Sequence, residues 1–129
     1  MPAADAQPFA YAVLRVVPRV ERGERLNVGV VLFCRRGDFL DLRTHVDLAR
    51  LAAFAPDLDP APVEARLAAL RLVVRGDPAG GALAELEPSE RFGWLVAPSS
   101  TIIQPSEVHT GITADPRATL DRLFETLVV

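Results

Sequence analysis

Residues 24–31 read Glu-Arg-Leu-Asn-Val-Gly-Val-Val and open the run Leu26–Arg35, which is apolar at most positions. Successive side chains of a strand point to opposite faces. In a regular strand one face would carry Leu26, Val28, Val30, Leu32 and Cys34, and the other Asn27, Gly29, Val31 and Phe33. Because both faces are largely apolar, the run predicts a central strand that is covered on both sides.

Four further segments have the composition of strands. Phe9–Val17 is rich in Val and Leu, and Phe39–Thr44 alternates apolar and charged residues, which predicts one solvated face. The Arg-Gly-Asp tripeptide at 36–38 fits a tight turn between the second and third strands. Ser99–Gln104 and Val108–Thr113 contain Thr and Ile and predict a fourth strand and a short fifth one.

Helical patterns follow the third strand and end the sequence. Asp47 can cap a short helix, Leu48–Ala55, and Asp59 can cap a longer helix that Gly76 ends. The longer helix has an apolar stripe at helical spacing, formed by Val63, Leu67, Leu70 and Val74. Asp115 opens a final helix. Its expected buried face consists of Leu120, Leu123, Phe124 and Leu127.

Together these elements predict an α+β fold: a mostly antiparallel sheet of four or five strands, with helices packed chiefly on one face. At 129 residues the chain is expected to be one domain, with residues 1–8 as a flexible lead-in. Ala79–Glu87 contains a Gly-Gly pair and is expected to be a loop, and Ser89 is expected to cap a single turn through Phe92.

The basic residues are distributed unevenly. All 14 of them are Arg, and the segment Arg15–Arg43 has a net charge of +3 while the rest of the chain has −6. Its basic residues are Arg15, Arg19, Arg22, Arg25, Arg35, Arg36 and Arg43. Arg favours planar anionic partners. Two interpretations stay open: a solvated sheet surface with local ion pairs, or a contact with phosphate or nucleic acid.

The sequence has no membrane or secretion signal. No apolar stretch approaches the ~18 residues that a transmembrane helix needs, and Met1–Gln7 lacks the basic and apolar regions of a signal peptide. The single cysteine, Cys34, provides no disulfide framework and is expected to be buried. We therefore expect a cytoplasmic protein.

Asn27 marks the first candidate polar site. It is the only Asn of the chain, and it lies two residues before Gly29 in an apolar run. A glycine within a strand indicates the close approach of another backbone or of a ligand. Arg15 and Glu24 can complete a polar cluster near the start of this strand. The cluster is either a buried network that holds the hairpin together or a binding surface at the edge of the sheet.

The second candidate is the segment Ser99–Gly111, in which hydroxyl groups, one Gln and one His gather. Its candidate residues are Ser99, Ser100, His109 and Thr110. Polar side chains concentrated on a loop and a strand often have a function, but they also form ordinary turns and strand edges. Both interpretations stay open.

Catalytic templates do not fit this sequence. The two histidines, His45 and His109, have no cysteine at metal-ligand spacing. Ser99, His109 and Asp115 provide the residue types of a hydrolase triad, but no nucleophile elbow accompanies them. There is no phosphate-binding loop and no dinucleotide fingerprint. We therefore assign no catalytic, cofactor-binding or metal-binding residue.

Two segments resemble a known family. The residues from Tyr11 to Pro18, then Gly23–Val31 with Glu24, Asn27 and Gly29, resemble the start of the bacterial domain-of-unknown-function family 3037. The later Ser-rich run through His109-Thr110-Gly111, then Asp115-Pro116 and Leu123-Phe124, resembles its C-terminal end. The resemblance covers about Phe9–Leu127. Members of this family are often encoded beside a HipA-like kinase, which implies a partner or regulator of such a kinase.

Three hypotheses about function follow. The first is a non-enzymatic partner or regulatory module, with a HipA-like kinase as the partner that the resemblance implies. The second is a phosphate or nucleic-acid binding protein that uses the arginines of the first strands. The third is a small enzyme with His109, Ser99, Ser100 and Glu24 around one cleft.

Overall fold

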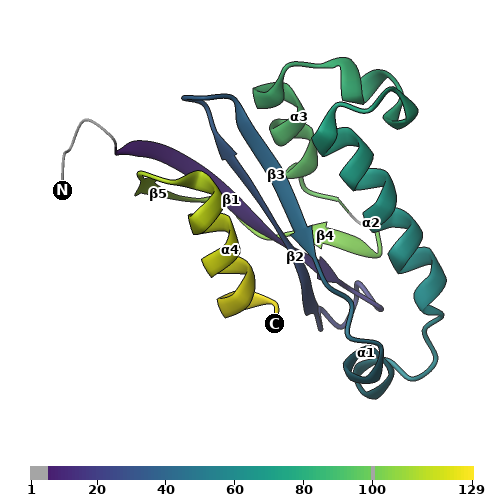
Figure 1. The fold of residues 1–129 in the computed structure, drawn as a ribbon. Coiled ribbons are helices and arrows are strands. Elements are labelled where there is room, and N and C mark those ends of the chain that lie inside the picture. Colours follow the sequence, from purple (N-terminus) through teal and green to yellow (C-terminus); the bar gives the residue numbers. More distant parts are fainter. Residues whose placement is uncertain (1–5, 100) are drawn as a thin grey trace.

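A computed structural model describes residues 6–99 and 101–129 of the chain. A five-stranded antiparallel sheet forms its centre, with strand order β3-β2-β1-β4 and with β5 beside the other half of β1 (Figure 1). Its strands are β1 (Gln7–Val16), β2 (Leu26–Cys34), β3 (Phe39–Thr44), β4 (Ile103–Pro105) and β5 (His109–Thr113). All five predicted strands are therefore present.

The first strand starts earlier than its sequence predicts. Gln7 and Pro8, which we assigned to the lead-in, pair with Thr113 and Ile112 of β5. This pairing extends β1 because β5 provides a neighbour for its first half. Residues 1–5 of the predicted lead-in lie outside the described residues.

The fourth strand is shorter than predicted and shifted along the chain. It was expected over Ser99–Gln104 but begins at Ile103 and includes Pro105. The hydroxyl of Thr101 donates to the carbonyl oxygen of Ile103 at 2.7 Å, so local bonds replace sheet pairing before the strand. Pro105 is tolerated because β4 is an edge strand.

The predicted helices form α1 (Leu48–Phe54), α2 (Pro60–Arg75) and α4 (Pro116–Leu127). Asp47, Asp59 and Asp115 each accept a hydrogen bond from a backbone N–H of the first turn, as their capping role predicts. The predicted single turn is instead α3 (Pro88–Leu95), whose N-cap position is Glu87 and not Ser89 and has no side-chain cap hydrogen bond. The segment expected as a loop contains two short 3-10 turns, η2 (Pro78–Gly80) and η3 (Ala82–Glu85).

Helices cover both faces of the sheet. Among the described residues, helices α1, α2 and α3 pack on one face, which we call the three-helix face, and α4 packs on the other, the α4 face (Figure 1). Buried residues of the three-helix face include Leu14, Val28, Val31, Leu67 and Phe92. Buried residues of the α4 face include Val30, Leu32, Cys34, Leu120 and Phe124. Strand β2 therefore has the two-sided burial that its sequence predicts.

The regular alternation that we expected along β2 is wrong. The pairing of β1 with β2 shifts between Leu14 and Arg15, because Leu14 lies opposite Gly29 whereas Arg15 lies opposite Asn27. Val28 is therefore the extra residue of a β-bulge. Val28 and Gly29 both point to the three-helix face, while Asn27 points to the α4 face. The bulge thus separates two residues that the sequence placed on one face.

Candidate functional site

Asn27 connects the central strand to the end of the last helix. Its side-chain amide donates a hydrogen bond to the carbonyl oxygen of Leu127 at 3.0 Å. The last carbonyls of a helix have no partner within the helix, so this bond satisfies one of them. Asn27 is half-buried and lies on the α4 face. Its amide therefore links β2 to the end of α4, and this bond is not one within the β1–β2 hairpin.

Arg15 lies in the middle of a polar row that crosses three strands. It faces Asn27 on β2 and Gln104 on β4. Burial lowers the pKa of Arg15, the positive charge of Arg25 lowers it further, and the negative charge of Glu107 opposes both effects. The buried Nε of Arg15 has no hydrogen-bond acceptor among residues 6–99 and 101–129. Gln104, and not the predicted Ser99 or His109, is the residue through which the two candidate segments meet.

Gly29 allows a close approach of backbone, as the sequence predicted, but on the opposite face from Asn27. A Cβ atom at Gly29 would lie 3.1 Å from the carbonyl oxygen of Arg43 and 3.1 Å from Cγ2 of Thr44. Both neighbours belong to β3, which pairs with β2 at this point. The glycine therefore serves strand packing.

Glu24 lies apart from this row, in the exposed connection between β1 and β2. Its carboxylate forms an ion pair with Arg22 at 2.5 Å. Bonding to Arg22 lowers the pKa of Glu24. Together with Phe54 and Leu58, Glu24 also lines an open hollow of about 660 Å³ between this connection and the loop after α1.

The second candidate segment is divided between the two faces of the sheet. Ser99 lines a hollow on the three-helix face. His109 is exposed and its ring stacks at a tilt on Tyr11 of the α4 face, with ring centroids 5.2 Å apart. Thr110 is exposed on β5, and Ser100 lies outside the described residues.

The structure does not bring His109, Ser99 and Glu24, the described residues of the enzyme hypothesis, into one cleft. His109 pairs with Tyr11, whereas the segment that carries Glu24 enters β2 at Leu26, opposite Val16. Val16 lies five positions after Tyr11, which is roughly 17 Å along a strand. Ser99 is on the other face from His109. These side chains cannot act on one substrate together.

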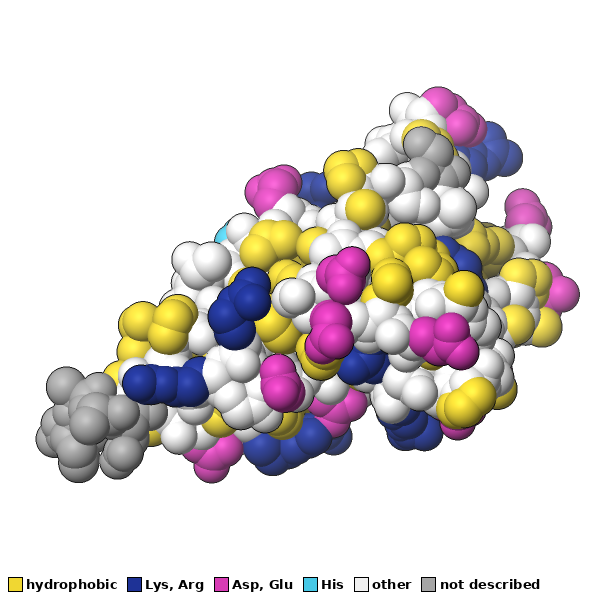
Figure 2. Space-filling view, turned by 90° about the horizontal axis from the view of Figure 1, so that it is seen from above, with side chains coloured by type: hydrophobic (Ala, Val, Ile, Leu, Met, Phe, Trp, Pro, Cys, Tyr) yellow, Lys and Arg dark blue, Asp and Glu magenta, His cyan; other side chains and the backbone are white. Residues whose placement is uncertain are grey.

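The arginines of the first three strands do not form one basic surface. Arg19, Arg22 and Arg25 lie in the connection before β2, and Arg35 and Arg36 follow its other end. The nine residues of β2 span roughly 30 Å. Arg43 is paired with Asp121 of α4. On the face shown in Figure 2, basic side chains are scattered among acidic and apolar ones.

The open edge of β5 differs from the other edges of the sheet. Edge strands are usually protected by charged side chains or by proline. β3 carries Asp41 and Arg43, and β4 contains Pro105, but β5 reads His-Thr-Gly-Ile-Thr and has neither. Ile112 is 67% exposed, and Val108, which precedes the strand, is 43% exposed.

Within residues 6–99 and 101–129, the backbone of β5 has bonding groups along this edge that no other strand uses. Both backbone groups of Val13 point toward the β4 and β5 side, because Val13 N–H donates to Ser106 Oγ and its carbonyl accepts from Ser106 N–H. Alternate residues of a strand point the same way, so Phe9 and Tyr11 bond to β5 through Gly111 and His109. The N–H and C=O groups of Thr110 and Ile112 consequently point outward. These four groups and the two exposed apolar side chains form what we call the β5 edge.

Comparison with known proteins places the chain in a family. A family model described as a protein of unknown function (DUF3037) matches residues 11–128. The chain belongs to the DUF3037 family. No curated protein and no solved structure matches this DUF3037 chain. The resemblance stated from Glu24, Asn27 and Gly29 is therefore confirmed.

The described residues of the DUF3037 chain contain neither a membrane-spanning helix nor a metal-binding cluster. None of the helices within residues 6–99 and 101–129 has the length and apolar character to cross a bilayer. The same residues contain no cluster of three His, Cys, Asp or Glu side chains arranged to hold a metal ion.

Sequence reasoning missed the hollow that contains Ser99, because two of its residues were not singled out. Arg66 lies three residues after Val63 and four before Leu70, so helical spacing places it within the apolar stripe of α2. Trp94 is the only Trp of the chain and lies in α3. An arginine inside an apolar stripe was the signal that could have revealed this hollow.

Proposed function

We propose that this protein is a non-enzymatic partner module that binds an extended segment of another protein along the β5 edge. The observation that carries the proposal is the outward direction of the N–H and C=O groups of Thr110 and Ile112 on a strand without charge or proline. An extended peptide that adds to a sheet edge obtains its affinity from such main-chain hydrogen bonds.

The side chains around the β5 edge support a particular kind of segment. Val108 and Ile112 are exposed on the same side of the strand, which favours apolar residues at alternate positions of the partner. Glu107 and Asp115 are exposed just before and just after β5. The fitting segment is therefore extended, apolar at alternate positions, and basic at both ends.

The first partner to examine is a HipA-like kinase, because of the gene pairing noted with the family resemblance. In this role the module would regulate or position the kinase without performing chemistry on a small molecule. The kinase would provide the extended segment, which would pair with the β5 edge and become a sixth strand of the sheet.

Binding of the purified kinase to Ile112→Arg and Thr110→Pro variants tests the proposal. Ile112→Arg places a charge on the edge. Thr110→Pro removes an outward N–H without removing a bond to β1. Each variant should weaken micromolar binding about tenfold or more, as loss of a central contact does. Val129→Arg is the matched control, because Val129 is also 67% exposed, and it should bind as the wild type does.

Two results would overturn the proposal. The first is an absence of kinase binding at micromolar concentration, or binding that Ile112→Arg leaves unchanged. The second is a homodimer in light scattering that Ile112→Arg dissociates, since the β5 edge would then be occupied by a second copy of the chain.

A further inference from the structure

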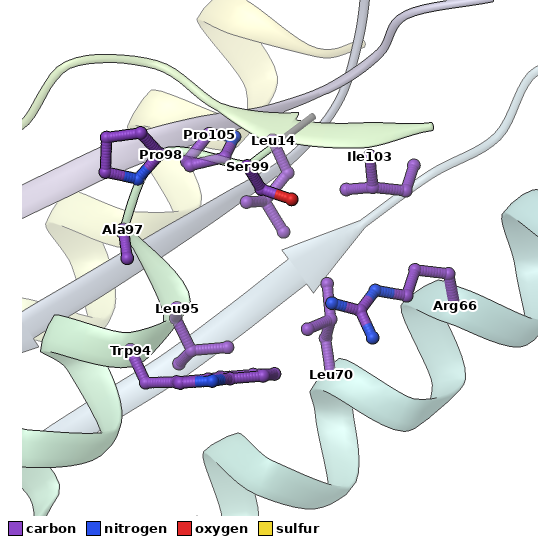
Figure 3. Close-up of a pocket in the computed structure, with 10 residues that line it drawn as sticks. All are labelled: Leu14, Arg66, Leu70, Trp94, Leu95, Ala97, Pro98, Ser99, Ile103 and Pro105. Carbon is purple, nitrogen blue, oxygen red and sulfur yellow. The ribbon is translucent and has the colours of Figure 1, made fainter. Parts of the chain in front are cut away.

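The hollow that contains Ser99 lies between α2, the end of α3 and the sheet (Figure 3). Its floor is apolar and belongs to the core, because Leu70, Leu95 and Ile103 are each at most 5% exposed. The indole of Trp94 borders one side, and the guanidinium of Arg66 reaches into the space from α2. The hydroxyl of Ser99 also points into it.

Arg66 is the unusual member of this set. Its guanidinium carbon lies 5.7 Å from the centre of the Trp94 ring, so the aromatic face holds the cation in place. Its Nε is buried and has no acceptor among the described residues. Leaving a buried donor without a partner is unfavourable. An acceptor that enters the hollow would remove that penalty.

Neighbouring arginines of the same layer do have partners. Arg71, one and a half turns further along α2, donates to the hydroxyl of Thr44 at 2.5 Å. Arg91 of α3 donates through Nη1 to the carbonyl oxygens of Val73 and Val74 at 3.0 and 2.9 Å, although its Nε, like that of Arg66, has no acceptor among the described residues. Arg66 therefore stands out as a cation that faces a hollow without an acceptor in the described part of the chain.

We propose that this hollow binds a carboxylate attached to a small apolar group. The carboxylate would take paired hydrogen bonds from the guanidinium of Arg66, whose fork matches two carboxylate oxygens. Ser99 Oγ adds no further donor, because its hydroxyl donates to Thr101 Oγ1 at 3.0 Å while the Thr101 hydroxyl donates to the carbonyl oxygen of Ile103. The apolar group would cover Leu70, Leu95 and Ile103 and contact the indole of Trp94.

Charge and size select this ligand class. Arg66 is the only cation that lines the hollow, and most other lining side chains are apolar, which disfavours a doubly charged phosphate. The volume of about 190 Å³ corresponds to roughly six waters of liquid, below the usual size of a drug-like site. Two sources present this chemistry: a free short-chain carboxylic acid and the C-terminal residue of a polypeptide.

Fluorescence of the single tryptophan provides a direct readout, because Trp94 borders the hollow. Titration with 4-methylpentanoate should give a saturable change at millimolar concentration or below, and 4-methylpentanamide should give none. A short peptide ending in a free Leu carboxylate tests the second source, with the C-terminally amidated peptide as its control. Of the two sources, a short-chain carboxylic acid and a polypeptide C-terminus, we assign to the hollow the one whose free acid binds more tightly.

Substitution of Arg66 tests the mode of binding. Arg66→Met retains much of the stem that packs on Trp94 and should weaken the carboxylate at least about tenfold, since it removes a charge-assisted pair. Arg66→Lys should weaken it less, because a single ammonium retains the charge but not the fork. Arg75→Met is the matched control, because Arg75 is exposed at the end of the same helix, and it should bind as the wild type does.

Three outcomes would overturn this inference: equal responses to the acid and the amide, no response to either free acid, or a wild-type response from a folded Arg66→Met. Circular dichroism of each variant establishes that it is folded. If Arg66→Met does not fold, Arg66→Lys still tests the role of the guanidinium. Kinase binding does not enter this experiment, so its result is independent of the β5 edge.

Discussion

The side-chain amide of Asn27 donates to the carbonyl oxygen of Leu127, so the bulged part of β2 holds the last turn of α4. The two residues are 100 positions apart. The bond closes the α4 layer onto the sheet at the point where that helix ends.

Replacement of Asn27 should loosen this end of the structure. Asn27→Ala leaves the Leu127 carbonyl without its partner, and the free energy of unfolding should fall by about 1 kcal/mol. Urea denaturation measures the change. Hydrogen exchange in the last turn of α4 should accelerate, whereas exchange in β5 should not. A variant as stable as the wild type would mean that water replaces the amide without cost.

Gly29 provides a second test, of packing between β2 and β3. In Gly29→Ala the new Cβ would lie 3.1 Å from Arg43 O and 3.1 Å from Thr44 Cγ2. We therefore expect the free energy of unfolding to fall by about 1 kcal/mol, which is at the low end for overpacking. Thr44→Ser removes the methyl group but retains the hydroxyl that accepts from Arg71. The double variant should therefore recover part of the loss, and a double-mutant cycle measures this coupling. Strictly additive changes would contradict the contact.

Local chemistry explains why most elements could be predicted from sequence. The caps at Asp47, Asp59 and Asp115 act within three residues, and the strand periods are equally local, so each was visible without the fold. The position of Val28 in a bulge was not, because it depends on how β2 pairs with β1. A one-residue change of register moves side chains to the other face.

The candidate site was predictable only in part, for the same reason. Arg15 and Asn27 do lie side by side, as their positions near two strand ends suggested. The role of Arg66 depends on Trp94, which reaches it from another helix 28 positions away, and no spacing rule connects them. Glu24 was grouped with Asn27 by sequence distance, but the chain leaves the sheet between them.

In the nucleic-acid alternative, the arrangement of the arginines limits how many of them can contact one DNA duplex, and this number sets the salt dependence of binding. One contact can use Arg19, Arg22 and Arg25 together, but not Arg35 or Arg36 at the other end of β2. If the protein binds duplex DNA, a plot of the logarithm of its binding constant against the logarithm of salt concentration should have a slope of about −3. Fluorescence anisotropy measures the slope. Arg35→Gln should leave it unchanged, whereas Arg25→Gln should reduce it by about one; an absence of binding at low salt ends this alternative.

Cys34 should make the protein less stable in alkaline solution. Its thiol is fully buried and donates to the carbonyl oxygen of Pro8 at 3.3 Å, and burial raises its pKa above the ordinary value of 9.0. Between the two pKa values the unfolded chain loses the proton while the folded chain keeps it. The stability that this thiol contributes is therefore complete below about pH 9 and is lost as the pH rises through the folded pKa.

Denaturation curves between pH 8 and pH 10 measure this loss. Cys34→Ala removes the titrating group, so the stability of this variant should decline less steeply with pH than that of the wild type. Its stability at pH 8 should be lower than that of the wild type, because removal of the sulfur leaves a cavity. A thiol reagent at pH 8 provides the second readout, since it should modify Cys34 far more slowly in the folded protein than in urea. Equal rates in the two states would place the thiol at the surface and contradict its burial between β2 and α4.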